Sequence, residues 1–138
     1  MDDQVFRGSC LCGGIEYEIS PPFLFFQYCH CSRCRKTSGS AHMANIFVKG
    51  SRFSWTKGEA TVKRFELPEA EHFCTGFCPE CGSSMPWVSR NGKYYLVPAG
   101  ALDDDPVCRP ERNIYWGSRA PWYVPVGDLP TFEAGKPR

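Results

Sequence analysis

The chain has 138 residues, about the size of a single domain, and its composition excludes wholesale disorder, collagen-like repeats and coiled coil. A hydrophobic fraction of 42%, with 10 Phe, 6 Tyr and 4 Trp, supplies an aromatic core. The formal net charge of +1 does not predict the basic surface that holds nucleic acid or an anionic membrane. We therefore expect one domain over residues 1–138 that binds neither nucleic acid nor membrane.

Cysteine usage points to metal chemistry. We expect a soluble, cytoplasmic protein, because we find no membrane-spanning run and no signal peptide in the sequence. The cytosol keeps thiols reduced, so nine cysteines, an odd number, indicate metal ligands or reactive thiols rather than a disulfide framework.

The clearest predicted strand spans residues 14–20, where Ile15, Tyr17 and Ile19 alternate with glutamates at the period of two of a half-buried strand. Two prolines end this strand. The aromatic run at residues 23–28 follows and predicts a buried strand that leads into a cysteine motif.

After that motif, residues 32–38 predict one short helical turn that stops at Gly39. Further strands are predicted at residues 41–48, 52–55, 61–67, 84–88 and 94–97. Beyond Leu102 we expect irregular chain, with the aromatic residues of 114–123 capping the core. Short strands among 13 Gly and 12 Pro favour a mainly β domain of several small sheets.

Seven of the nine cysteines fall in three short motifs. They are Cys10-Leu11-Cys12-Gly13-Gly14, Cys29-His30-Cys31-Ser32-Arg33-Cys34 and Cys78-Pro79-Glu80-Cys81-Gly82. The third motif is typical of a zinc knuckle, because its tight turn directs two thiolates at one ion and its glycine permits close backbone approach. A closed tetrahedral zinc site needs four ligands, so a second pair must come from elsewhere in the chain.

Two assignments of that second pair are open. Cys31 and Cys34 could join the knuckle, but the intervening stretch is far longer than the zinc-ribbon spacing of roughly 15 to 20 residues. Alternatively the pair comes from the first motif, whose two glycines supply a matching turn. We prefer the second assignment, which predicts a structural zinc on Cys10, Cys12, Cys78 and Cys81.

The middle motif then stands alone. Its thiols, Cys29, Cys31 and Cys34, lie within six residues, so one loop can place them on one zinc ion. A zinc with three protein ligands keeps a position for water or substrate, which is typical of a catalytic site. We therefore predict a second, catalytic zinc here. His30 or His42 could instead supply a fourth ligand and make the site purely structural.

Cys74 and Cys108 belong to neither set, and the sequence gives them no role beyond that of small buried hydrophobes. Basic residues beside the middle motif could hold substrate carboxylates, although such side chains are usually just solvated. They are Arg33, Arg35 and Lys36.

The order of the three motifs resembles a known family. With Gly8-Ser9 before the first motif and the late segment Ser118-Arg119-Ala120-Pro121-Trp122-Tyr123, it resembles the glutathione-dependent formaldehyde-activating enzymes, whose family includes centromere protein V. The resemblance implies a mainly β, Mss4-like (β-tent) zinc-binding fold of several small antiparallel sheets with little helix. It also implies a structural zinc on the first and third motifs and a catalytic zinc on the middle one.

The proposed reaction of the founding enzymes adds the thiol of glutathione to formaldehyde and is classed as carbon-sulfur lyase chemistry. The resemblance thus implies a zinc-dependent lyase with two zinc ions per chain, acting on glutathione or a similar thiol and on formaldehyde or another small aldehyde. An open three-cysteine zinc suits this reaction, because it can deprotonate a thiol and hold it beside a carbonyl carbon.

Two other functions fit part of the pattern. A non-enzymatic zinc module could bind a protein or nucleic acid partner, although the balanced charge does not predict the basic stripe that nucleic acid requires. A redox enzyme resembling methionine sulfoxide reductase type B would use Cys108 or Cys74 as nucleophile. The sequence does not distinguish a monomer from a homodimer.

Overall fold

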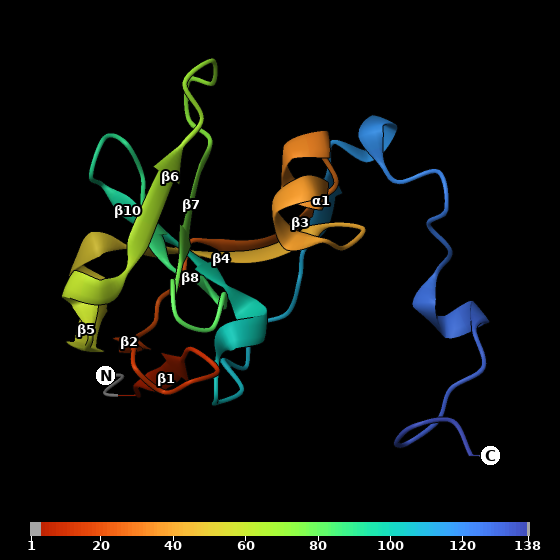
Figure 1. Cartoon of the computed structure of the whole chain (residues 1–138), viewed down its shortest axis with the longest axis horizontal. Helices are drawn as coiled ribbons and strands as arrows, with labels where there is room; N and C mark the ends of the chain where they lie inside the picture. The colour runs from red at the N-terminus through yellow and green to blue at the C-terminus, as the bar shows by residue number, and fades with distance from the viewer. Residues whose placement is uncertain (1–3, 138) are drawn as a thin grey trace.

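Three small β-sheets and one α-helix make up residues 4–137, the part of the chain that the computed structural model describes (Figure 1). The predicted mainly β fold is confirmed. Short 3-10 turns link the strands at η1 (Gly50–Arg52), η2 (Glu59–Thr61), η3 (Ala99–Ala101), η4 (Trp116–Ser118) and η5 (Val126–Asp128).

The first sheet is antiparallel, in the order β1-β2-β5. Its strands are β1 (Phe6–Ser9), β2 (Glu16–Ile19) and β5 (Phe53–Lys57). In β2, Tyr17 and Ile19 are buried and Glu16 is exposed, which is the alternation that predicted this strand. Gly8 of β1 lies opposite Tyr17, and a Cβ at Gly8 would overlap the tyrosine ring, so the sheet requires glycine there.

The second sheet has five strands in the order β11-β3-β4-β10-β9. They are β3 (Phe25–Cys29), β4 (Met43–Lys49), β9 (Trp87–Val88), β10 (Tyr94–Pro98) and β11 (Arg112–Ile114). Cys29, the last residue of β3, lies opposite Met43 of the antiparallel β4. On its other side β3 pairs in parallel with β11, which places Ile114 beside Cys29. A late segment of the chain therefore borders the middle cysteine motif.

The third sheet has the order β6-β7-β8, with strands β6 (Lys63–Glu66), β7 (Cys74–Phe77) and β8 (Ser84–Met85). The turn from β7 to β8 carries the knuckle cysteines. Pro86 separates β8 from β9, so the strand predicted over residues 84–88 is divided between two sheets. Proline has no N–H to donate, which interrupts the hydrogen-bond ladder at this point.

The predicted helical turn is α1 (Ser32–Ser38), which begins three residues after β3 ends. The thiol of Cys31 caps its start by accepting a hydrogen bond from the Cys34 amide at 3.3 Å. Gly39 ends it with a φ of 66°, and its N–H donates to the Arg35 carbonyl at 2.8 Å. Glycine adopts this left-handed conformation without steric cost, which explains the stop.

The core joins the first sheet to the five-stranded sheet. Its buried side chains are Phe6, Ile15, Tyr17, Ile19, Phe26, Ile46, Val48, Phe53, Met85 and Val97. The Phe53 ring links the two sheets, with its centroid 5.6 Å from that of Tyr17 and 3.9 Å from that of Tyr95. Cys10 and Cys78 also belong to this core, so the first and third cysteine motifs meet at its edge.

The C-terminal segment, drawn in blue, runs apart from the sheets (Figure 1). We expected the aromatic residues of 114–123 to cap the core, and this expectation is wrong for three of them, because Tyr115, Trp116 and Trp122 are 64%, 41% and 63% exposed. Trp116 and Tyr123 instead contact His30, beside the middle cysteine motif. Within residues 4–137, the structure holds no helix long and apolar enough to cross a membrane.

Candidate metal centres

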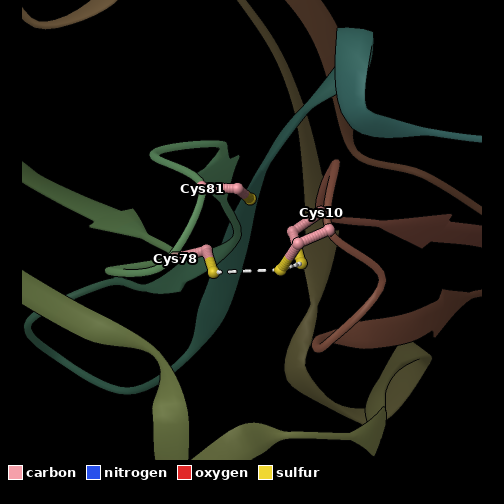
Figure 2. Close-up of side chains that lie close together, drawn as sticks. Cys10, Cys78 and Cys81 are labelled. Carbon is pink, nitrogen blue, oxygen red and sulfur yellow. Dashed lines mark hydrogen bonds between the residues drawn. The ribbon is translucent and has the colours of Figure 1, made fainter.

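The first cluster joins two turns that lie far apart in the sequence. The thiols of Cys10, Cys12, Cys78 and Cys81 all lie within 4.8 Å of one another. Figure 2 shows Cys78 and Cys81 on one turn, facing Cys10 on the other. The Cys12 Sγ atom is 3.5 Å from that of Cys10 and 3.8 Å from that of Cys78. The structure thus brings the knuckle together with the first motif rather than with the middle one.

Each turn is shaped by its backbone. The Gly13 amide donates to the Cys10 carbonyl at 3.0 Å, and the Gly82 amide donates to the Cys78 carbonyl at 2.8 Å. Both glycines have a φ near +80°, at 79° and 78°. This region disfavours residues with a Cβ, so glycine at these positions permits the tight turns that direct paired thiols to one point.

The surroundings of the first cluster favour thiolates at Cys10 and Cys81, whereas its neighbours raise the pKa of Cys12. The Ile15 amide donates to the Cys10 thiol at 3.3 Å, and the hydroxyl of Ser83 lies 3.2 Å from the Cys81 thiol. Hydrogen bonds from Ser83, side chain first and backbone second, lower the pKa of Cys81 to about 5. The Ser83 hydroxyl also accepts from the Leu11 amide at 2.9 Å, which ties the two turns together.

The second cluster is local. The thiols of Cys29, Cys31 and Cys34 come from the end of β3, the N-cap of α1 and the first turn of α1, and they too lie within 4.8 Å of one another. Cys29 and Cys34 are buried and Cys31 is half-buried. Hydrogen bonding to Cys34 is the main cause that lowers the pKa of Cys29, and the same contact raises the pKa of Cys34. The close contact between these two thiols therefore favours one thiolate shared by the pair over two separate ones.

Neither histidine that sequence reasoning offered as a fourth ligand joins this cluster. Among the described residues, the group consists of three thiols with no His, Asp or Glu. The Nε2 atom of His30 lies 2.8 Å from the Oδ1 of Asn113, and His42 stacks on Tyr28 at 4.0 Å between ring centroids. Burial lowers the pKa of His42, which favours its neutral form. Three protein ligands would leave a bound metal with an open position.

The sulfur geometry of the first cluster fits a tetrahedral thiolate-binding metal. Zinc binds thiolates at about 2.3 Å, which separates two sulfurs of a tetrahedron by about 3.8 Å. The two Sγ separations at Cys12 agree with that spacing and are far too long for a disulfide bond. All nine cysteines are free. Both clusters therefore have a donor set that could hold a metal ion.

A cleft of about 940 Å³ lies beside the clusters. Its wall includes Cys10 and Gly82 at one end and reaches Ser38 of α1, together with His42 and Met43. The rest of the lining is mixed, with polar side chains such as Asn45 and Asp103 among apolar ones that include Leu11, Phe65, Phe77, Met85, Trp87 and Leu102. None of the three thiols of the second cluster lines this cleft, so the cleft borders their helix rather than containing them.

Basic residues lie on the helix that carries part of the second cluster. Helix α1 carries Arg33, Arg35 and Lys36 and no acidic residue. The Nε atom of Arg35 is buried without a hydrogen-bond partner in the described part of the chain. Since a buried donor without a partner is costly, this guanidinium is available to an incoming carboxylate.

Cys74 and Cys108 lie outside both clusters. Cys74 is fully buried in β7, where Arg64 Nη2 and Arg90 Nε donate to its sulfur at 3.2 and 3.4 Å. Cys108 is half-buried, and burial raises the pKa of its thiol. Cys74 therefore lacks the exposure, and Cys108 the lowered pKa, that a redox nucleophile needs.

Sequence reasoning overlooked the residues that surround His30. The ring of His30 contacts Trp116 and Tyr123, and its nitrogen pairs with Asn113. They come from the chain beyond Leu102, which was interpreted as irregular, where Tyr123 belonged to the segment that carries the family resemblance and Asn113 gave no signal.

Comparison with known proteins identifies the family. The model of the glutathione-dependent formaldehyde-activating enzyme family matches residues 5–118. A curated Halomonas elongata protein, named "Putative glutathione-dependent formaldehyde-activating enzyme", is 30% identical over 119 residues, which cover 78% of this chain and 72% of that protein. A crystal structure of a Rhodobacter sphaeroides protein shares the fold, with a TM-score of 0.59 at 21% identity over 78% of this chain and 97% of that one. The chain therefore belongs to the glutathione-dependent formaldehyde-activating enzyme family.

Proposed function

We propose that the protein is a zinc-dependent carbon-sulfur lyase that joins a thiol to formaldehyde or another small aldehyde. One observation carries the proposal, which is the second cluster of three thiols, with no fourth ligand among residues 4–137, in a chain of this family. In this proposal Cys29, Cys31 and Cys34 hold the catalytic zinc. A second zinc, with a structural role, is assigned to Cys10, Cys12, Cys78 and Cys81.

Zinc bound by the three thiolates would supply an open position at which an incoming thiol loses its proton and stays a nucleophile at neutral pH. The three cysteines bind the ion and reduce its Lewis acidity through their negative charge, which suits thiol capture better than water activation. Cys31 is only half-buried, so this side of the cluster is open to solvent and to a substrate.

The reaction balances without an oxidant or reductant. The thiol sulfur forms a bond to the aldehyde carbon, and the π electrons of the carbonyl bond move to its oxygen. That oxygen receives the proton that the thiol gave up, so the product is an S-hydroxyalkyl thioether. The protein accelerates this addition mainly by holding the two reactants close together.

We further propose that the thiol is glutathione or a similar anionic thiol. The basic residues of α1 support this choice, because their charges lie beside the three-cysteine cluster and Arg35 carries a buried, unpartnered Nε. A guanidinium binds a carboxylate through charge-assisted hydrogen bonds. We propose a cytoplasmic location for the protein, since both clusters need reduced thiols.

The direct test is the rate of adduct formation between glutathione and formaldehyde, measured by exchange NMR at equilibrium above the spontaneous rate. We expect acceleration by the wild-type protein and none by Cys31→Ser. Cys108→Ser, which alters a thiol outside both clusters, should retain full activity. If wild-type protein with two zinc ions does not change the exchange rate for any thiol tested, the proposed reaction is wrong.

A further inference from the structure

The residue between the first two thiols of the second cluster is fixed by a distant part of the chain. His30 follows Cys29 at the end of β3, and its amide donates to the Ile114 carbonyl of β11 at 3.0 Å. Since β11 pairs with β3 in parallel, this bond continues the ladder past the last residue of β3. The loop from Cys29 to Cys31 therefore depends on β11 for its backbone position.

The His30 side chain is held by the same strand. It is fully buried, and its Nε2 lies 2.8 Å from the Oδ1 of Asn113. Its Nδ1 has no hydrogen-bond partner in residues 4–137. Ring centroids of Trp116, His42 and Tyr123 lie 4.9, 5.0 and 5.8 Å from that of His30. The partly buried contact to Asn113 is thus the polar anchor of a buried ring that lies among aromatic side chains.

A change at this anchor acts on the two clusters unequally. His30 lies between Cys29 and Cys31, so any rotation of its backbone moves both thiols. The first cluster stands on the turns after β1 and β7, whose hydrogen bonds include neither His30 nor Asn113. Loss of the anchor should therefore disturb the three-cysteine cluster and leave the four-cysteine cluster intact.

We propose that Asn113 is a positioning residue for the three-cysteine metal site, acting through its contact with His30. The inference rests on the proposed function in so far as it takes these three thiols to hold a metal ion. Residues that orient metal ligands from outside the coordination sphere contribute about 10- to 100-fold to metal affinity in other proteins. Asn113 touches no thiol, so its effect must pass through the loop at His30.

Three variants separate this role from general stabilisation of β11. Asn113→Leu keeps a similar size and removes the acceptor, whereas Asn113→Asp retains an acceptor oxygen toward His30. Arg112→Gln is the matched control, because Arg112 lies next to Asn113 on β11 but contacts Gln27 and the Phe25 ring. Each variant is purified with zinc and followed by its thermal melt.

The readout is metal affinity at each cluster. A mild chelator first removes the exchangeable ion, and cobalt is then added in its place. The thiolate-to-cobalt absorption band measures the occupancy of the three-cysteine site while the chelator competes for the cobalt. We expect Asn113→Leu to weaken this site about 10- to 100-fold and to alter the band, while zinc at the other cluster is unchanged. Asn113→Asp and Arg112→Gln should both bind cobalt like the wild-type protein.

Unchanged cobalt affinity in Asn113→Leu would overturn the inference, even if its melting temperature fell. Equal weakening at both clusters, or failure of Asn113→Asp to restore binding, would overturn it as well. A wild-type protein that holds both ions but does not accelerate adduct formation refutes the proposed reaction alone. A wild-type protein that binds no metal at the three thiols refutes both.

Discussion

Both cysteine clusters gather thiols within 4.8 Å of one another, but they are built in opposite ways. The four-cysteine cluster draws two thiols from the turn after β1 and two from the turn after β7, and Cys10 and Cys78 are part of the core. The three-cysteine cluster takes all its thiols from residues 29–34, where β3 of the five-stranded sheet ends and α1 begins. The four-cysteine site joins two segments that are distant in the sequence. The three-cysteine site lies within one short segment, formed by the end of a strand and a short helix.

This difference indicates at which site the fold could tolerate the loss of a metal ion. An ion on the four-cysteine cluster would connect segments 66 residues apart. Because the unfolded chain does not hold these thiols together, the free energy of metal binding would stabilise the folded state. An ion on the three-cysteine cluster would hold only a local segment whose helix already has an N-cap and a C-cap. We therefore assign stability to the first cluster and chemistry to the second.

The largest expected effect is that of Cys78→Ser. This variant removes a buried ligand from the four-cysteine cluster, and structural zinc sites contribute about 10 kcal/mol or more to folding. That amount is comparable to the whole stability of a typical domain, so we expect an unfolded protein in circular dichroism. Cys108→Ser is the control and should remain folded. A Cys78→Ser protein that melts like the wild type would contradict the structural assignment.

Cys31→Ser sharpens the comparison at the other cluster. Serine is a good N-cap, so it should preserve the start of α1 while removing a metal ligand. We expect the fold to survive, the zinc content to fall by one ion per chain and the exchange rate to drop about 100-fold or more. Elemental analysis, circular dichroism and exchange NMR measure these three quantities. Unfolding as complete as that of Cys78→Ser would erase the distinction between the clusters.

Gly82→Ala tests the turn of the four-cysteine cluster. Gly82 has a φ of 78°, and no heavy atom lies within 4 Å of a Cβ built there, so the cost is conformational. We expect a loss of about 1–2 kcal/mol in urea unfolding. Gly100→Ala is the matched control, since its Cβ also meets nothing within 4 Å but its φ is not positive. Equal stability of the two variants would show that this turn does not need glycine.

The smallest expected effect is that of Arg35→Gln on substrate binding. Removing the guanidinium should raise the KM for glutathione about 10-fold and leave kcat nearly unchanged, because the carboxylate contact is the same in the ground and transition states. A small uncharged thiol should not distinguish the variant from the wild type. Steady-state rates with both thiols check this. An equal effect on both thiols would assign Arg35 a structural role instead.

Much of the fold could be predicted because its strands follow simple patterns. The alternation in β2, the aromatic run of β3 and the glycine stop of α1 predicted elements that the structure contains. The strands β1, β7 and β11 were not predicted. β1 and β7 contain Gly8 and Gly76, which are required by the Tyr17 ring and by the carbonyls of Met85 and Pro86. Close packing between distant segments explains these glycines, and no local pattern reveals it.

The grouping of the thiols was open to sequence reasoning because glycine turns and ligand counts constrain it. The residues that surround the thiols could not be predicted from the sequence. Asn113 lies in β11, a three-residue edge strand with two exposed residues and no apolar alternation. Its position beside His30 follows from parallel pairing with β3 across more than 80 residues, which only the tertiary structure defines.

The most direct test of the central claim is zinc per chain before and after brief exposure to a mild chelator, with the fold followed by circular dichroism. The account predicts two zinc ions that fall to one while the spectrum stays unchanged, because only the three-cysteine site is open. A single zinc that resists the chelator, or two that leave together as the protein unfolds, would contradict the division into a structural and a chemical site.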